Sequence, residues 1–157
     1  MRHVYERPFQ HTAIDVDTLR AFPLSDMTEQ LKAESTFRDS GRDALTLVHG
    51  PNLTLVLTVV RGGAACDEHR SPGPAAIIML SGALVPSSPH SGTPRTLEAG
   101  SMIAVGNTVH VLTAKSDAVF LTIIGRQQHA GRTRARGRST ASRRAAATGE
   151  ARPRKSP

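Results

Sequence analysis

Short apolar runs rich in β-branched residues recur between Asp43 and Gly125, and turn-forming residues separate them. The runs are 44–49, 52–61, 75–80, 82–87, 94–99, 101–105, 108–114 and 118–125. Glycine, proline and asparagine fill the breaks, as in Gly50-Pro51-Asn52. About eight strands at this regular spacing are typical of an all-β sandwich or barrel. Several runs are apolar at consecutive positions, which predicts strands covered on both faces.

The first 42 residues lack this strand pattern, and one stretch predicts a short helix at residues 25–36. Asp26 is followed three residues later by Glu29, which resembles a capping box and predicts Asp26 as the N-cap. Met27, Leu31 and Glu34 form no strong apolar stripe, so we expect this helix to lie on the surface rather than to form a core. Residues 1–42 are therefore predicted to be a partly helical arm before a barrel at 43–125.

The composition changes at Arg126, where a basic tail begins. Up to Gly125 the chain has 10 lysines and arginines against 12 acidic residues, whereas residues 126–157 have 10 against Glu150 alone. The net charges are −2 and +9, so the formal charge of +7 belongs to the tail. The tail has no large apolar residue, and we predict that residues 126–157 are disordered. They could bind nucleic acid non-specifically, or they could be a solvated appendage.

Three other features indicate a soluble cytoplasmic protein that does not enter a membrane. Cys66 is the single cysteine, so no internal disulfide forms and no oxidising compartment is implied. Residues 1–17 are interrupted by charge and lack the apolar segment of a signal peptide. The longest apolar stretch, 53–60, is far shorter than the roughly 20 residues of a membrane-spanning helix.

Two motifs in the strand-rich region resemble those of the cupin superfamily, in particular its small single-domain proteins. The first begins at Gly63, reaches His69, and continues through a Pro/Gly turn and the strand "IIMLSG" to Gly82. The second is "LEAG" at 97–100, followed by "TVHVLTAKSDAVFLTII" at 108–124. The resemblance implies a cupin-type jelly-roll β-barrel that forms a homodimer, and an unpaired edge strand gives such pairing a physical reason. Cupin functions are diverse, so the activity stays open.

The metal-binding pattern of the superfamily is incomplete in this chain. The resemblance places ligands at His69 and His110, but Ser71 and Ala75 stand where a second histidine and a glutamate are usual. Three side chains could supply a third donor: Asp67, Glu68 and His90. The resemblance implies either one divalent transition metal (Fe, Mn, Ni or Zn) or none, because two nitrogen ligands alone bind a metal weakly.

Strand alternation predicts which of these side chains share a face, since residues two apart on a strand point the same way. Three would face one side of the first motif: Asp67, His69 and Ser71. Cys66 and Glu68 would face the other side. His110 would share a face with Thr108, and Ala75 with Ile77 and Met79. A barrel lined in this way favours an apolar or weakly polar ligand over a hydrated metal.

The sequence thus leaves different classes of function open. The first is a small-molecule-binding or sensing barrel whose pocket residues are His69, His110, Met79, Ile77, Ser71 and Thr108. The second is a metal-dependent enzyme of the dioxygenase, isomerase or lyase type that uses His69 and His110. The third is a nucleic-acid-associated protein that acts through its tail. The missing ligands favour the first class over the second, and the charge of −2 on the folded part counts against the third.

Overall fold

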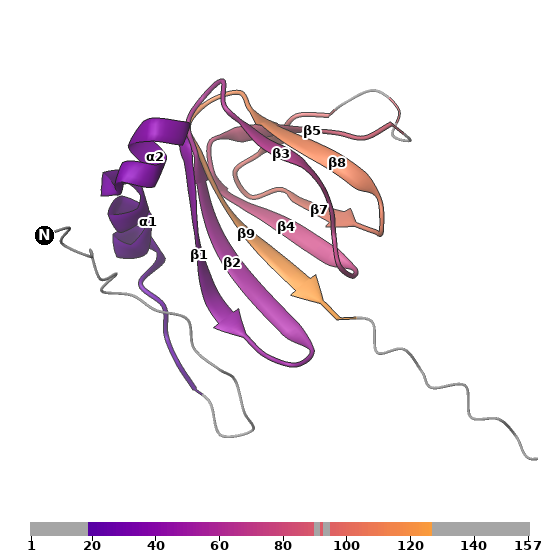
Figure 1. Ribbon diagram of the computed structural model, residues 1–157, viewed down its shortest axis with the longest axis horizontal. Coiled ribbons are helices and arrows are strands. Elements are labelled where there is room, and N and C mark those ends of the chain that lie inside the picture. The colour runs from indigo at the N-terminus through magenta and orange to yellow at the C-terminus, as the bar shows by residue number, and fades with distance from the viewer. Residues whose placement is uncertain (1–18, 90–91, 93–94, 127–157) are drawn as a thin grey trace, which may run out of the picture.

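The computed structural model describes residues 19–89, 92 and 95–126 (Figure 1). Within these residues two helices precede nine strands: α1 (Leu24–Ala33), α2 (Ser35–Ser40), β1 (Arg42–His49), β2 (Leu53–Val60), β3 (Ala65–Arg70), β4 (Ala75–Ser81), β5 (Ala83–Ser87), β6 (Leu97–Glu98), β7 (Met102–Val105), β8 (Val109–Ala114) and β9 (Ala118–Gly125). Predictions for residues 1–18, for His90 and for the tail from residue 127 onward fall outside the described residues. No helix in the described part is long and apolar enough to cross a membrane.

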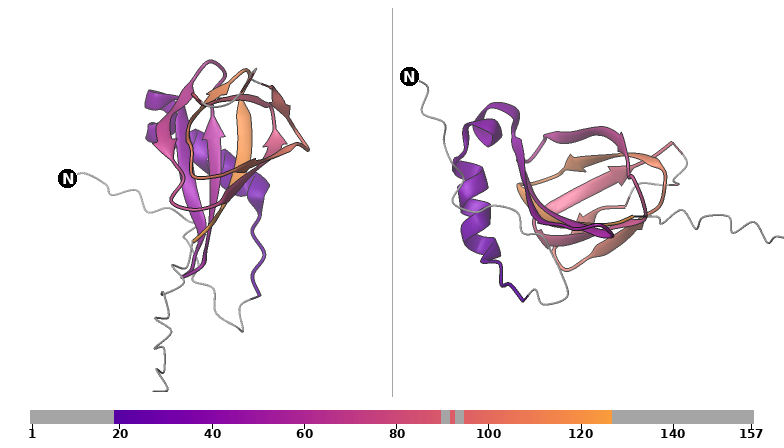
Figure 2. Two further views of the ribbon diagram at one scale, coloured as in Figure 1. Left: turned by 90° about the vertical axis from the view of Figure 1, so that its right-hand side faces the viewer. Right: turned by 60° about the horizontal axis from the view of Figure 1, so that its bottom comes forward.

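The strands form two antiparallel sheets that enclose a common interior. The five-stranded sheet has the order β1-β2-β9-β4-β7, and the four-stranded sheet has the order β3-β8-β5-β6. Figure 2 shows the sheets curving around this interior, with both helices outside the barrel. The predicted all-β jelly-roll fold is confirmed.

Two apolar cores explain why several strands are apolar at consecutive positions. Neighbouring residues of β2 and β9 point to opposite faces of the sheet. Val60 and Phe120 belong to the core between the two sheets. Val59 and Val119 belong to a second core between the five-stranded sheet and the helices. The prediction that these strands are covered on both faces is confirmed.

The prediction that the helix contributes little to a core is wrong. Met27 and Leu31 lie one turn apart on α1 and are buried in the outer core, and α2 adds Phe37. The apolar stripe was missed because it continues across Glu34, where the backbone is extended and α1 ends. Asp26 is not the N-cap, since α1 begins at Leu24 and its N-cap forms no side-chain hydrogen bond.

The strand β3 is absent from the eight apolar runs because its sequence, ACDEHR, is polar. It lies at one edge of the four-stranded sheet, and among the described strands it pairs only with β8. Arg42 on the facing outer strand β1 donates hydrogen bonds to the backbone oxygen of Ala65, at 2.9 Å, and to the Asp67 carboxylate. This contact joins the two sheets along one side of the barrel.

Candidate functional site

Two histidines lie side by side on adjacent strands of the four-stranded sheet. His69 on β3 is paired directly with His110 on β8. Their ring centroids are 4.3 Å apart and the rings meet edge to face at 60°. His110 is 6 % exposed, whereas His69 is exposed. The structure thus brings together the two histidines of the sequence motifs.

A backbone carbonyl two residues earlier holds each imidazole in a fixed orientation. The His69 Nδ1 lies 2.8 Å from the Asp67 oxygen, and the His110 Nδ1 lies 3.1 Å from the Thr108 oxygen. A carbonyl oxygen only accepts hydrogen bonds, so each Nδ1 carries the donated proton. In the neutral imidazole, Nε2 is then the nitrogen that accepts a hydrogen bond from a ligand.

A β-bulge in β3 changes the predicted faces of the first motif. The register with β8 shifts between Cys66 and His69. Cys66 and His69 therefore line the same small cavity, although strict alternation would put them on opposite faces. The prediction that Cys66 points away from His69 is wrong, and the inserted residue is the physical reason. Burial raises the pKa of the Cys66 thiol.

The small cavity lies in the barrel interior and has a volume of about 200 Å³. It is bounded by both sheets: Val56, Thr58, Cys66, His69, Ala75, Ile77, Val105, His110, Leu112, Phe120, Thr122 and Ile124. The predicted pocket residue Ile77 belongs to this wall, and so does Ala75. Most of the lining is aliphatic or aromatic, so the histidines face a largely apolar space.

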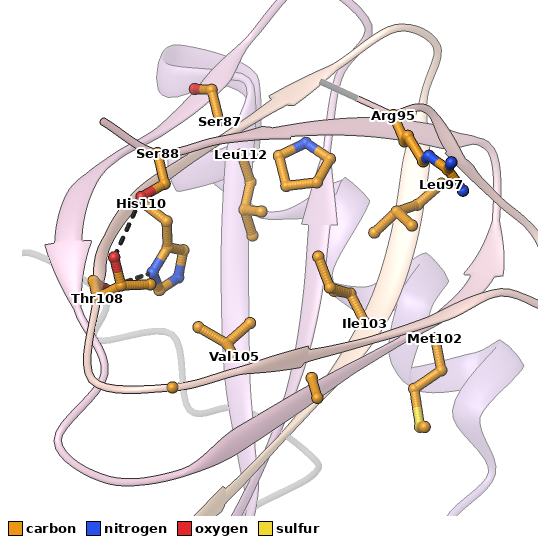
Figure 3. Close-up of a pocket in the computed structure, with 13 residues that line it drawn as sticks. Ser87, Ser88, Arg95, Leu97, Met102, Ile103, Val105, Thr108, His110 and Leu112 are labelled. Atoms are coloured by element: carbon orange, nitrogen blue, oxygen red, sulfur yellow. Dashed lines mark hydrogen bonds between the residues drawn. The ribbon is translucent and has the colours of Figure 1, made fainter. Parts of the chain in front are cut away.

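A larger cavity of about 650 Å³ lies between β7 and the strands of the other sheet. Its lining residues are Pro86, Ser87, Ser88, Arg95, Leu97, Met102, Ile103, Ala104, Val105, Gly106, Thr108, His110 and Leu112. Figure 3 shows Ser88, Thr108 and His110 at one end of the drawn site and Arg95 beside Leu97 at the other. His110 also lines the small cavity, so the buried imidazole is reached from both spaces.

Two other predicted pocket residues lie elsewhere. Met79 is 1 % exposed and belongs to the core between the sheets, where it lines neither of these cavities. Ser71 is buried, and its hydroxyl donates a 2.5 Å hydrogen bond to the backbone oxygen of Gly73. Thr108, by contrast, lines the large cavity, and its Oγ1 lies 3.1 Å from the Ser88 hydroxyl oxygen.

Among the described residues, which do not include His90, the side-chain donors do not make up the ligand set of a resident metal. The Asp67 carboxylate is paired with Arg42, whose hydrogen bond and charge lower the pKa of Asp67. Glu68 is exposed, and the hydroxyl of Ser71 is engaged in its own turn. Among the described residues, no three His, Cys, Asp or Glu side chains are grouped so that they could hold a metal ion. Two imidazoles beside the Ala75 methyl therefore do not fit the metal centre that the motifs imply.

The sequence motifs did not indicate one end of the large cavity. Arg95 and Leu97 come from β6 and the residue stretch before it, while Ile103 and Val105 come from β7. The continuous apolar run of β7, MIAV, was a usable signal for a lining strand. No comparable signal singled out Arg95, because it stands outside both motifs.

Comparison with known proteins identifies the fold. A conserved protein of unknown function from Streptococcus pyogenes is 18 % identical, with a TM-score of 0.55 over 76 % of this chain and 96 % of that one. A cupin superfamily protein from Desulfitobacterium hafniense is 15 % identical, with a TM-score of 0.55 over 69 % and 93 %. An RmlC-like cupin from Desulfovibrio desulfuricans is 16 % identical, with the same score over 69 % and 97 %. No family model and no curated protein matches the sequence. The protein has the cupin fold.

Proposed function

We propose that this protein is a small-molecule-binding or sensing barrel whose ligand occupies the large cavity and contacts His110. The observation that carries the proposal is the position of His110, which is 6 % exposed and lines both cavities. A cavity of about 650 Å³ is in the range of sites that bind small organic molecules.

The wall and the polar groups have different roles in binding. Leu97, Ile103, Val105 and Leu112 provide apolar surface, and burial of a ligand against it contributes about 25 cal/mol per Å². The fixed Nδ1 bond of His110 presents Nε2 at low conformational cost, because the ring is oriented before the ligand arrives. A few oriented polar groups in a mainly apolar wall are typical of a ligand pocket.

The alternative function is a metal-dependent dioxygenase, isomerase or lyase that uses His69 and His110. One observation favours it: the carbonyl-bound Nδ1 of each ring is the arrangement seen in many metal-binding histidines. Within the part of the chain that the structure describes, no side chains join His69 and His110 as the further donors that a stable mononuclear site needs. We therefore place binding without a resident metal ahead of metal-dependent catalysis.

A neutral probe tests the binding function without assuming the charge of the natural ligand. Isothermal titration of metal-free protein with 4-phenylbutan-1-ol should give saturable binding with a Kd on the order of 0.1–1 mM, as expected for so small a molecule. Ile103→Trp should weaken binding because the larger indole takes up part of the cavity. Ile78→Trp is the control, since Ile78 on β4 is half-buried and lines neither cavity.

A second variant tests the histidine directly. His110→Gln should weaken binding roughly 3- to 10-fold, through the loss of one oriented hydrogen bond. His49→Gln, at the exposed end of β1, should leave the affinity unchanged. Circular dichroism melts show whether each variant is folded. Equal affinity in wild type, Ile103→Trp and His110→Gln would contradict the proposed site.

A further inference from the structure

We infer that the large cavity selects small amphipathic carboxylates, with the carboxylate at Arg95 and the apolar body along the wall toward His110. The inference rests on the proposed function and adds the chemical class of the ligand. It follows from the distribution of charge and polarity around the cavity.

Arg95 is the one charged side chain among the described residues that line the large cavity. No aspartate or glutamate lies among these lining residues, so the charge of Arg95 is not neutralised from within the described wall. A guanidinium presents a planar set of N–H donors that matches the two oxygens of a carboxylate. A single cation suits a singly charged group better than a doubly charged phosphate.

Three other arginines in or beside the barrel strands already have partners. Arg42 contacts Asp67 and the backbone of Ala65. Arg61 stacks on the ring of Phe37, with 5.0 Å to the centroid, and Arg70 bonds to Asn107. Arg95 forms no such hydrogen bond or ion pair within the described part of the chain, so its donors are available to a ligand.

The remainder of the wall sets the shape of the ligand. Figure 3 shows Leu112, Ile103 and Val105 in the space between the Arg95 end and the His110 end. His110, Thr108 and Ser88 bring polar atoms to that second end. The matching molecule has an anionic head, an apolar body, and room for one hydrogen-bonding group at its far end.

Three probes of one shape test this inference: 4-phenylbutanoate, 4-phenylbutan-1-ol and 4-phenylbutylamine. In calorimetry at low ionic strength, wild type should bind the acid roughly 3- to 10-fold more tightly than the alcohol, and the amine most weakly. Added salt should reduce the advantage of the acid, because the Arg95 end is exposed to solvent. Arg95→Gln should bring the ratio of acid affinity to alcohol affinity close to one.

Arg38→Gln is the matched control, because Arg38 is an exposed arginine on α2 and does not line the large cavity. It should retain the full preference for the acid. Equal binding of acid and alcohol by wild type, or a preference that persists in Arg95→Gln, overturns the inference and leaves the proposed function standing. Failure of both probes to bind, or binding unaffected by Ile103→Trp, overturns the proposed function and the inference together.

Discussion

Replacing Leu31 by alanine tests whether α1 is an integral part of the fold. Leu31 is 0 % exposed and packs in the outer core between α1 and the five-stranded sheet. The substitution removes three buried carbons, at about 0.8 kcal/mol each, which gives a transfer cost near 2.4 kcal/mol. The cavity left behind adds to this, so we expect a loss of roughly 2.5–5 kcal/mol in the free energy of unfolding. Affinity for the cavity probes should not change, because Leu31 belongs to the other core.

Urea unfolding followed by circular dichroism measures this loss, with Leu53→Ala as the control. Leu53 begins β2 and is 36 % exposed, so its truncation should cost less than about 1 kcal/mol. The slope of free energy against urea should match wild type in both variants. If Leu31→Ala costs no more than Leu53→Ala, α1 does not pack on the sheet and the two-core account is wrong.

Three further predictions concern the turns and the titrating groups. Gly82 has a φ of 70°, and a Cβ there would lie 1.9 Å from the Asp117 backbone oxygen, so Gly82→Ala should lower the thermal midpoint by many degrees. Arg42 lowers the pKa of Asp67, so the stabilisation by this pair is present above the ordinary pKa of an aspartate and is lost as the pH falls through the lowered value. In a carboxyl-carbon NMR titration of Arg42→Gln, the pKa of Asp67 should return toward its ordinary value; an unchanged midpoint would rule out the pairing. Burial raises the pKa of the Cys66 thiol, so the folded protein should react with DTNB at neutral pH more slowly than the urea-unfolded chain, and equal rates would contradict burial.

The fold could be predicted because its strands carry their own local signals. Apolar runs with turn residues between them marked eight strands, and in the structure one strand overlaps each run. The ninth, β3, has polar side chains because it is an exposed outer strand, so hydrophobic patterning could not reveal it. The apolar stripe of the helical region was missed because it is shared by two helices. Met27 on α1 and Phe37 on α2 face the same core, but the extended backbone at Glu34 interrupts the helical periodicity between them.

The candidate site was harder to predict because it depends on closure of the barrel. The resemblance identified His69 and His110, and the sheet register places them opposite each other. Regular alternation along β3 predicted that Cys66 points away from His69, but the β-bulge between them puts both side chains on the same face. No local sequence signal marks that bulge. Arg95 reaches the same cavity as His110 only because β5 joins β6 to β8 in one sheet and β7 lines the cavity from the other sheet.

An amide HSQC titration of EDTA-treated protein with 4-phenylbutan-1-ol tests most directly whether the large cavity binds a small organic molecule without metal. We expect saturable shift changes concentrated at residues 102–106 and 108–112, in and beside β7 and β8 where they line the large cavity, in the absence of metal. Changes that are non-saturable or scattered, or that appear only after Zn, Fe, Mn or Ni is added, would contradict a cavity that binds organic molecules without a resident metal.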